Sequence, residues 1–289
     1  MSTNVMTRVK DKFATVDGLK LRFIEEGEGP AVLLLHGASL GSSADVFIRN
    51  LAPLARAGFR AIAFDQPGFG LSDVPTDLSA GYRRDSIPKF ADAVGLKTPA
   101  LIGHSQAGNP AVQLALKEPR RYSHVVVLAT GSLLPPLEGG EEGRDAAAQQ
   151  RLERRMASSE PTIEDTRKQL EATLYHHELI TPEELALRHS RSIGRNFETF
   201  VARSEAAEAA PPKQPATPLW QRLTELQVPL LMIFGRNDRA NAAQRAVMLK
   251  EKYPQLNVHI VDNCKHLLPW DAADDFIRLT VPFLKAASK

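Results

Sequence analysis

The sequence predicts an α/β protein built on a doubly wound, mostly parallel sheet. Short, almost continuously apolar runs recur along the chain, and each is followed by a polar or glycine-containing bend. Helical patterns lie between most of these runs, and such alternation places the functional loops at the carboxyl ends of the strands. The runs are AVLLLHG from residue 31, RAIAFD from 60, PALIGHS from 99, HVVVLAT from 124, PLLMIFG from 229 and NVHIVD from 257.

Two antiparallel strands are predicted ahead of these runs. Residues 13–29, FATVDGLKLRFIEEGEG, alternate apolar and polar side chains around Asp17 and Gly18. An Asp-Gly pair suits a tight hairpin turn, so we expect a hairpin to open the fold.

An insertion is predicted between HVVVLAT and PLLMIFG, because no further apolar strand run occurs there. A proline-rich stretch, AAPPKQPATP, returns the chain to the sheet. We therefore expect a core domain over residues 1–134 and 216–289, with residues 135–215 forming a helical cap inserted after the sixth strand, over the carboxyl edge of the sheet.

The predicted cap carries charged amphipathic helix patterns. One covers residues 164–180, EDTRKQLEATLYHHELI, and the other covers 181–194, TPEELALRHSRSIG. The second opens with Thr181 as N-cap and Pro182 at the first helical position, which is a strong start signal.

Composition points to a small-molecule ligand. The chain has 289 residues, of which 43% are hydrophobic, and 36 Lys and Arg nearly balance 34 Asp and Glu. A nucleic-acid or anionic-lipid partner has little support in such a balance. No run approaches the roughly 18 apolar residues of a membrane span, and the single Cys264 allows no internal disulfide, so a cytoplasmic protein is expected.

Ser105, in the stretch GHSQAG, is the candidate nucleophile. A nucleophile elbow places serine on a sharp turn between strand and helix, with small residues where the backbones crowd. Ala107 stands where the G-x-S-x-G pattern has its last glycine, and Gly108 follows. The alternative is an ordinary turn serine.

A serine nucleophile needs a base, and the base needs a carboxylate that orients it. In the elbow arrangement the acid and the histidine follow the serine along the chain, each after a later strand. Asp238 and His266 occupy those places, with Asp262 as the rival acid. The other histidines lie in or beside strands, next to glycines, or in the predicted cap.

The developing oxyanion requires amides that are already aimed at it. We expect them from Gln106, the residue after the nucleophile, and from Ala38 in the loop HGASLGSS. Ser39 in that loop and His104 beside the nucleophile are expected to contact the substrate.

Two further patterns are interpreted without a catalytic role. The stretch FDQPGFGLSD is interpreted as turn chemistry, with Asp65 bonding local amides. The sequence has no metal-ligand spacing and no phosphate-cradling loop, so no metal or cofactor is predicted.

Five segments, LLLHGASLGSS, FDQPGFGLSD, GHSQAG, FGRNDR and CKHLLPW, make the chain resemble the α/β-hydrolase superfamily over nearly its whole length. Within it the chain is most similar to the meta-cleavage product hydrolases, which cut a carbon-carbon bond in 2-hydroxy-6-oxo-dienoates formed by ring-opening of catechols. The resemblance implies that Arg188 binds the substrate's carboxylate and that Trp270 is an aromatic residue of the pocket. For an enzyme of this type we expect a homodimer.

The chain differs from that family beside the predicted triad. It has His104 where the family usually has asparagine, Lys265 where it has glycine, and Leu267 where an aromatic residue is frequent. A carboxylesterase or lactonase therefore stays open as an alternative, and a non-catalytic ligand receptor with the hydrolase fold is a further one.

Overall fold

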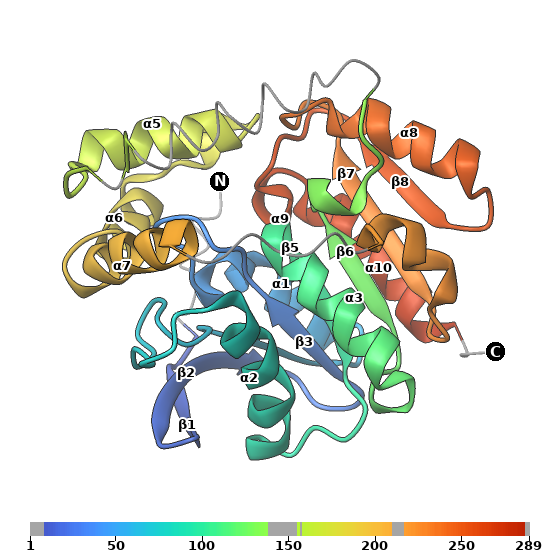
Figure 1. The fold of residues 1–289 in the computed structure, drawn as a ribbon, viewed down its shortest axis with the longest axis horizontal. Coiled ribbons are helices and arrows are strands. Elements are labelled where there is room, and N and C mark those ends of the chain that lie inside the picture. Colours follow the sequence, from blue (N-terminus) through green and yellow to red (C-terminus); the bar gives the residue numbers. More distant parts are fainter. Residues whose placement is uncertain (1–8, 138–154, 157, 210–216, 287–289) are drawn as a thin grey trace.

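A computed structural model describes residues 9–137, 155–156, 158–209 and 217–286, and its centre is an eight-stranded sheet (Figure 1). The strand order is β1-β2-β4-β3-β5-β6-β7-β8, and every pair from β4 to β8 is parallel. The predicted parallel sheet and all six apolar runs are thus confirmed. The strands are β1 (Lys12–Val16), β2 (Leu19–Glu26), β3 (Ala31–Leu35), β4 (Arg60–Phe64), β5 (Ala100–His104), β6 (Val125–Leu128), β7 (Leu230–Gly235) and β8 (Asn257–Val261).

The hairpin at the start of the fold is also confirmed. Strands β1 and β2 pair antiparallel, and β2 pairs antiparallel with β4. Asp17 (φ 49°) and Gly18 (φ 80°) both adopt the left-handed conformation, which matches the twist of a two-residue hairpin.

Helices cover both faces of the sheet. Successive residues of a strand point to opposite faces, so Leu33 belongs to one apolar cluster and Leu34 to the other. On the Leu33 side lie α2 (Ala80–Ala93), α3 (Gly108–Lys117) and α8 (Ala242–Lys252), and on the Leu34 side lie α1 (Ile48–Arg56), α9 (Leu268–Asp271) and α10 (Ala273–Lys285). In the described part of the chain no helix is long and apolar enough to cross a membrane.

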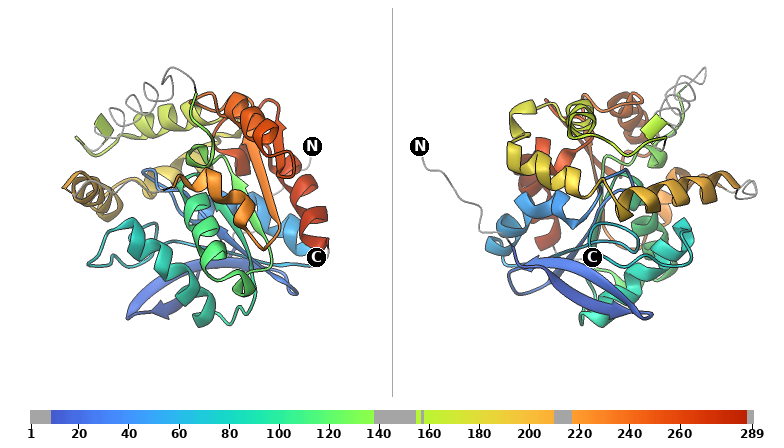
Figure 2. Two further views of the ribbon diagram at one scale, coloured as in Figure 1. Left: turned by 45° about the vertical axis from the view of Figure 1, so that its right-hand side comes forward. Right: turned by 90° about the vertical axis from the view of Figure 1, so that its left-hand side faces the viewer.

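Helices α5 (Ile163–Thr173), α6 (Pro182–Ser190) and α7 (Arg195–Ala209) lie between β6 and β7, which confirms a helical insertion after the sixth strand. They lie together on one side of the molecule in Figure 1 and in the left view of Figure 2, and this side faces the viewer in the right view. Thr181 caps α6 by accepting a hydrogen bond from the Glu184 amide, as predicted. Residues 138–154 of the predicted cap and 210–216 of its linker lie outside the described residues.

The prediction of one helical pattern over 164–180 is wrong in its second half. Helix α5 ends at Thr173, and Leu174 is extended (φ −113°, ψ 137°). The Asp271 carboxylate accepts hydrogen bonds from the amides of Tyr175 (2.8 and 2.9 Å) and His176 (3.0 Å). These long-range bonds replace the helical ones, and no local stop signal marks the place.

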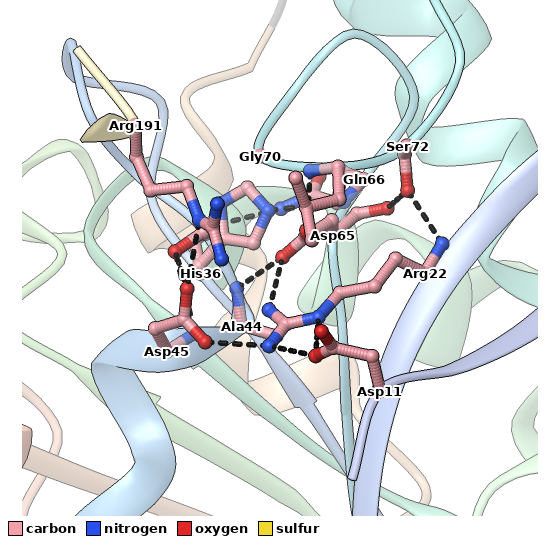
Figure 3. Close-up of polar contacts among 12 residues, drawn as sticks. Asp11, Arg22, His36, Ala44, Asp45, Asp65, Gln66, Gly70, Ser72 and Arg191 are labelled. Atoms are coloured by element: carbon pink, nitrogen blue, oxygen red, sulfur yellow. Dashed lines mark hydrogen bonds and ion pairs between the residues drawn. The ribbon is translucent and has the colours of Figure 1, made fainter. Parts of the chain in front are cut away.

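A buried ionic network fastens α6 to the sheet (Figure 3). Arg22 of β2 donates to Asp45 (2.7 Å) and to Asp65 (3.3 Å), and Arg191, which follows α6, donates to Asp45 (3.0 Å). Asp65 also accepts the amides of Ala44 (2.6 Å) and Leu71 (2.8 Å), which confirms the predicted turn role of this residue.

Candidate active site

Ser105 lies on the sharp turn between β5 and α3. It has φ 56°, in the left-handed region that residues with a Cβ rarely adopt, at a cost of about 1 kcal/mol or more. A short 3₁₀ turn over Ser105–Ala107 leads directly into the helix. The strained backbone is the geometry that a nucleophile elbow requires.

Small residues allow this turn to close. A Cβ on Gly103 would lie 2.4 Å from the Ala107 carbonyl oxygen, and one on Gly108 would lie 2.2 Å from Thr130 Oγ1. Thr130 Oγ1 in turn donates to the Ser105 carbonyl (2.7 Å). Ala107 itself is accommodated in the core, so the crowded positions are 103 and 108, which explains why the last glycine of the motif is replaceable.

The structure brings Ser105, His266 and Asp238 together. His266 Nε2 lies 2.9 Å from Ser105 Oγ, and its Nδ1 lies 3.1 Å from both carboxylate oxygens of Asp238. Asp238 follows β7 and His266 follows β8, so the carboxyl ends of the parallel strands β5, β7 and β8, at one edge of the sheet, supply all three groups. The rival Asp262 pairs with Arg236, and its side chain is 71% exposed.

Asp238 is buried and remains ionised. Burial alone would raise the pKa of its carboxyl, but the interaction and hydrogen bond with His266, with a further effect of Arg239, hold the pKa below the usual range. An ionised acceptor at Nδ1 places the imidazole proton there. The Nε2 lone pair is then available to accept the Ser105 proton.

His104 contacts the backbone of the candidate base. It is buried, and its Nε2 donates to the His266 carbonyl oxygen at 2.8 Å. Burial, with the nearby His266, lowers the pKa of His104 to about 3, so the ring stays neutral. The side chain of His104 therefore bonds the backbone of His266, whereas we predicted that it contacts the substrate.

The loop after β3 runs against the elbow. A Cβ on Gly37 would lie 3.0 Å from Ser105 Cβ and 3.3 Å from Ser105 Oγ. His36 Nε2 accepts the Gln66 amide (3.0 Å), so its Nδ1 donates to the Gly37 carbonyl (2.6 Å) and holds this approach. Ala38 and Gln106, the expected oxyanion donors, are the residues that follow Gly37 and Ser105.

Arg188 and Ser39 meet at the same loop. Arg188 Nη2 donates to the Leu40 carbonyl (3.0 Å) and to Ser39 Oγ (3.4 Å). Arg188 Nε is buried without a hydrogen-bond partner among the described residues. Burial, opposed by Asp45, lowers the pKa of Arg188 to about 10, so its guanidinium stays charged near neutral pH.

Trp270 lies in the core beside this arginine. Its Nε1 donates to the Val46 carbonyl (2.9 Å), and the Arg49 guanidinium carbon lies 5.3 Å from its ring. Trp270 and Arg188 line one small cavity together with Gly41.

Comparison with known proteins identifies the family. The family model described as the alpha/beta hydrolase fold matches residues 30–273. The chain belongs to the α/β-hydrolase fold family. It is similar to the Pseudomonas putida protein named 2-hydroxy-6-oxononadienedioate/2-hydroxy-6-oxononatrienedioate hydrolase 2, with 31% identity over 92% of each chain. It is also similar to the Burkholderia cepacia 2-hydroxy-6-oxo-6-phenylhexa-2,4-dienoate hydrolase, with 29% identity over 98% of this chain and 99% of that one.

Solved structures agree with this placement. A meta-cleavage product hydrolase from Pseudomonas fluorescens IP01 superimposes with a TM-score of 0.75 at 25% identity, over 95% of this chain and 97% of that one. The resemblance found in the sequence is therefore confirmed.

This α/β-hydrolase has three arginines near the triad that the sequence interpretation missed. Arg239 Nη2 lies 3.2 Å from His266 Nε2. Arg203 Nη2 donates to the Ala38 carbonyl (3.4 Å), and Arg83 and Arg203 both lie over the Phe69 ring. Arg239 could have been noticed because it directly follows Asp238, whereas Arg83 and Arg203 resemble any arginine of a charged helix.

Outside the undescribed segments, no group of three His, Cys, Asp or Glu side chains could hold a metal ion.

Proposed function

We propose that the protein hydrolyses a carbon-carbon bond in a 2-hydroxy-6-oxo-dienoate-type ring-cleavage product. The observation that carries the proposal is the continuous hydrogen-bonded chain from Ser105 through His266 to Asp238, with the charged Arg188 beside the loop that meets the elbow. Relatives named as hydrolases of such dienoates match over nearly the whole chain.

In this proposal the substrate first converts from its dienol to its keto form. Ser105 Oγ then attacks the ketone at carbon 6 while His266 Nε2 takes the serine proton. The amides of Ala38 and Gln106 stabilise the oxyanion. The bond between carbons 5 and 6 breaks, its electron pair enters the conjugated keto acid, and His266 Nε2 gives the serine proton to carbon 5 of the resulting carbanion. Water activated by His266 hydrolyses the acyl ester on Ser105.

Arg188 is the proposed ligand of the substrate's carboxylate. A planar guanidinium can hold a carboxylate through two parallel hydrogen bonds, and the buried Nε of Arg188 has a donor to offer. Ser39 is proposed to contact the substrate beside Arg188, and His104 is proposed to support the reaction by positioning His266. Trp270 is proposed to close the base of the small cavity that it lines together with Arg188. Residues 135–215 are proposed to act as a cap over a core of residues 1–134 and 216–289.

The test separates the proposed reaction from ester or lactone hydrolysis. Arg188→Gln should lower kcat/KM for a 2-hydroxy-6-oxo-dienoate by tenfold or more, because a charge-assisted contact is lost, and should affect 4-nitrophenyl acetate much less. Arg167→Gln, which replaces an α5 arginine paired with Glu164, is the matched control. Equal losses on both substrates would contradict the proposed role of Arg188, and ester turnover with an untouched dienoate would place the protein among the esterases or lactonases.

The cellular compartment and the oligomeric state of the protein are proposals too. The single Cys264, which is buried and free, fits a reducing compartment, and we propose the cytoplasm. We propose a homodimer because homodimers are common among enzymes of this type, and light scattering of the purified protein tests this oligomeric state.

A further inference from the structure

Two arginines from different elements meet at one buried aromatic ring next to the candidate active site. The guanidinium carbons of Arg203, on α7, and Arg83, on α2, lie 4.0 and 5.6 Å from the Phe69 ring centroid. The His36 ring, which holds the loop after β3, lies 4.9 Å from the same centroid. Arg203 also donates to the carbonyl of Ala38, a residue of that loop. The pair therefore lies beside the groups that face Ser105.

The surroundings of Arg83 are unfavourable for a positive charge that has only a structural role. Its Nε is buried and has no hydrogen-bond partner in the described part of the chain. It lies in the first turn of α2, where the helix dipole disfavours a positive charge. Burial lowers the pKa of its guanidinium, and no described carboxylate bonds to it. A buried donor without a hydrogen-bond partner is destabilising, and a bound anion would supply the missing acceptor.

The acidic groups nearby are already engaged. Asp45 accepts from both Arg22 and Arg191, and Asp65 accepts from Arg22 and from two backbone amides. Arg188 donates to the Leu40 carbonyl, two residues further along the loop than the carbonyl that Arg203 bonds, and its Nε has no hydrogen-bond partner among the described residues. Two arginine Nε donors, those of Arg83 and Arg188, thus have no described partner near the loop where the substrate is proposed to bind.

We propose that Arg83 and Arg203 bind a second carboxylate of the substrate, while Arg188 binds the first. The inference rests on the proposed function and narrows it to dienoates whose ketone side chain also ends in a carboxylate. Two relatives are named for different substrates, one for a dienedioate and one for a 6-phenyl dienoate. The buried Nε of Arg83, which has no described partner, favours the dianion, because a phenyl ring offers no acceptor for it.

The first experiment compares the two substrate classes. Wild type should show a kcat/KM for 2-hydroxy-6-oxononadienedioate at least tenfold above that for the 6-phenyl dienoate. Arg83→Met should lower kcat/KM for the dienedioate by tenfold or more, mainly through KM, and should change the phenyl substrate by less than threefold. Arg84→Met is the matched control, since Arg84 is the half-buried neighbour, with 38% of its side chain exposed, and pairs with Asp85. Equal effects of Arg83→Met on both substrates, or a wild-type preference for the phenyl substrate, would overturn the inference.

A binding measurement separates failure of this inference from failure of the proposed function. Calorimetry on Ser105→Ala compares 4-oxoheptanedioate with 4-oxoheptanoate, which lacks the second carboxylate. A preference for the diacid that disappears in Ser105→Ala/Arg83→Met supports the second carboxylate site even if wild type turns over no dienoate. Equal affinities for the two acids, or a preference unchanged by Arg83→Met, would contradict that site whatever the reaction proves to be.

Discussion

His104 Nε2 donates a hydrogen bond to the backbone carbonyl oxygen of His266 across 2.8 Å. The residue before the candidate nucleophile therefore holds the residue that carries the candidate base. Because the pKa of His104 is lowered to about 3, mainly by burial, the ring is a neutral donor throughout the working range of a hydrolase. His104 is thus a positioning residue for His266.

Removing this bond should slow catalysis more than it weakens binding. His104→Ala is expected to lower kcat about tenfold with little change in KM, because a small displacement of the base is costly. His104→Asn, which keeps a donor, should recover part of the loss. Neither variant should change the shape of the pH–rate profile above pH 4. His259→Ala, which removes a histidine of β8 bonded to Asn257, is the control. A KM increase with unchanged kcat would instead assign His104 to substrate binding.

Asp238 is expected to be essential for the function of His266. Asp238→Asn should preserve the fold but favour the wrong imidazole tautomer, with kcat falling by about 10³ to 10⁴. Steady-state turnover and thermal melting of the same preparations check both halves of this prediction. Asp262→Asn, at the neighbouring strand end, should leave kcat unchanged. A comparable loss in that control would mean that the acid has been assigned wrongly.

The elbow should tolerate a methyl group at one position and not at another. Gly103→Ala forces a Cβ to within 2.4 Å of the Ala107 carbonyl, so we expect a loss of about 1–3 kcal/mol in the free energy of unfolding and a disturbed Ser105. A Cβ on Gly81 would meet only Ser79 Oγ at 3.5 Å, and Gly81→Ala should be neutral or stabilising by up to about 1 kcal/mol. Urea denaturation of both variants tests the contrast, and equal stability would refute it.

The buried network should make stability depend on pH through Asp65. Burial, opposed by Arg22, raises the pKa of Asp65 to about 6 from an ordinary value of 3.8. Between these two values the folded protein binds more protons than the unfolded chain, so this group lowers the free energy of unfolding as pH rises from 4 to 6, by about 2 kcal/mol. The opposite effect of Asp45, whose pKa is lowered by Arg22 and Arg191 despite burial, falls below pH 4.

Comparison of wild type with Asp65→Asn isolates that contribution. The variant is expected to be less stable at every pH, because hydrogen-bond acceptors for Ala44 and Leu71 are weakened, but to have a flatter profile between pH 4 and 6. Chemical denaturation at a series of pH values measures the slope. An unchanged slope in the variant would show that Asp65 does not cause the pH dependence of stability in this range.

Local patterns predicted the features that depend on chain periodicity and turn chemistry. The apolar runs predicted every parallel strand, Asp17 and Gly18 predicted the hairpin, and the small residues around Ser105 predicted the sharp turn. The spacing of Asp238 and His266 after later strands predicted that they would meet Ser105, because carboxyl ends of parallel strands share one edge.

Features decided by long-range contacts could not be predicted in this way. Helix α5 ends at Thr173 because Asp271, far along the chain, bonds the next amides. The direction of the His104 ring toward His266 depends on how two loops pack. Arg83 and Arg203 become neighbours only because Phe69 lies between α2 and α7, and no spacing in the sequence records this.

Serine-dependent carbon-carbon bond hydrolysis is tested most simply by the bleaching rate of a coloured 2-hydroxy-6-oxo-dienoate with wild type and with Ser105→Ala. A serine nucleophile predicts rapid bleaching by wild type and a loss of at least about 10³-fold in kcat for the variant, which should still bind the substrate. Equal bleaching by the two proteins would contradict a serine nucleophile, and an unbleached dienoate with wild type would contradict carbon-carbon bond hydrolysis.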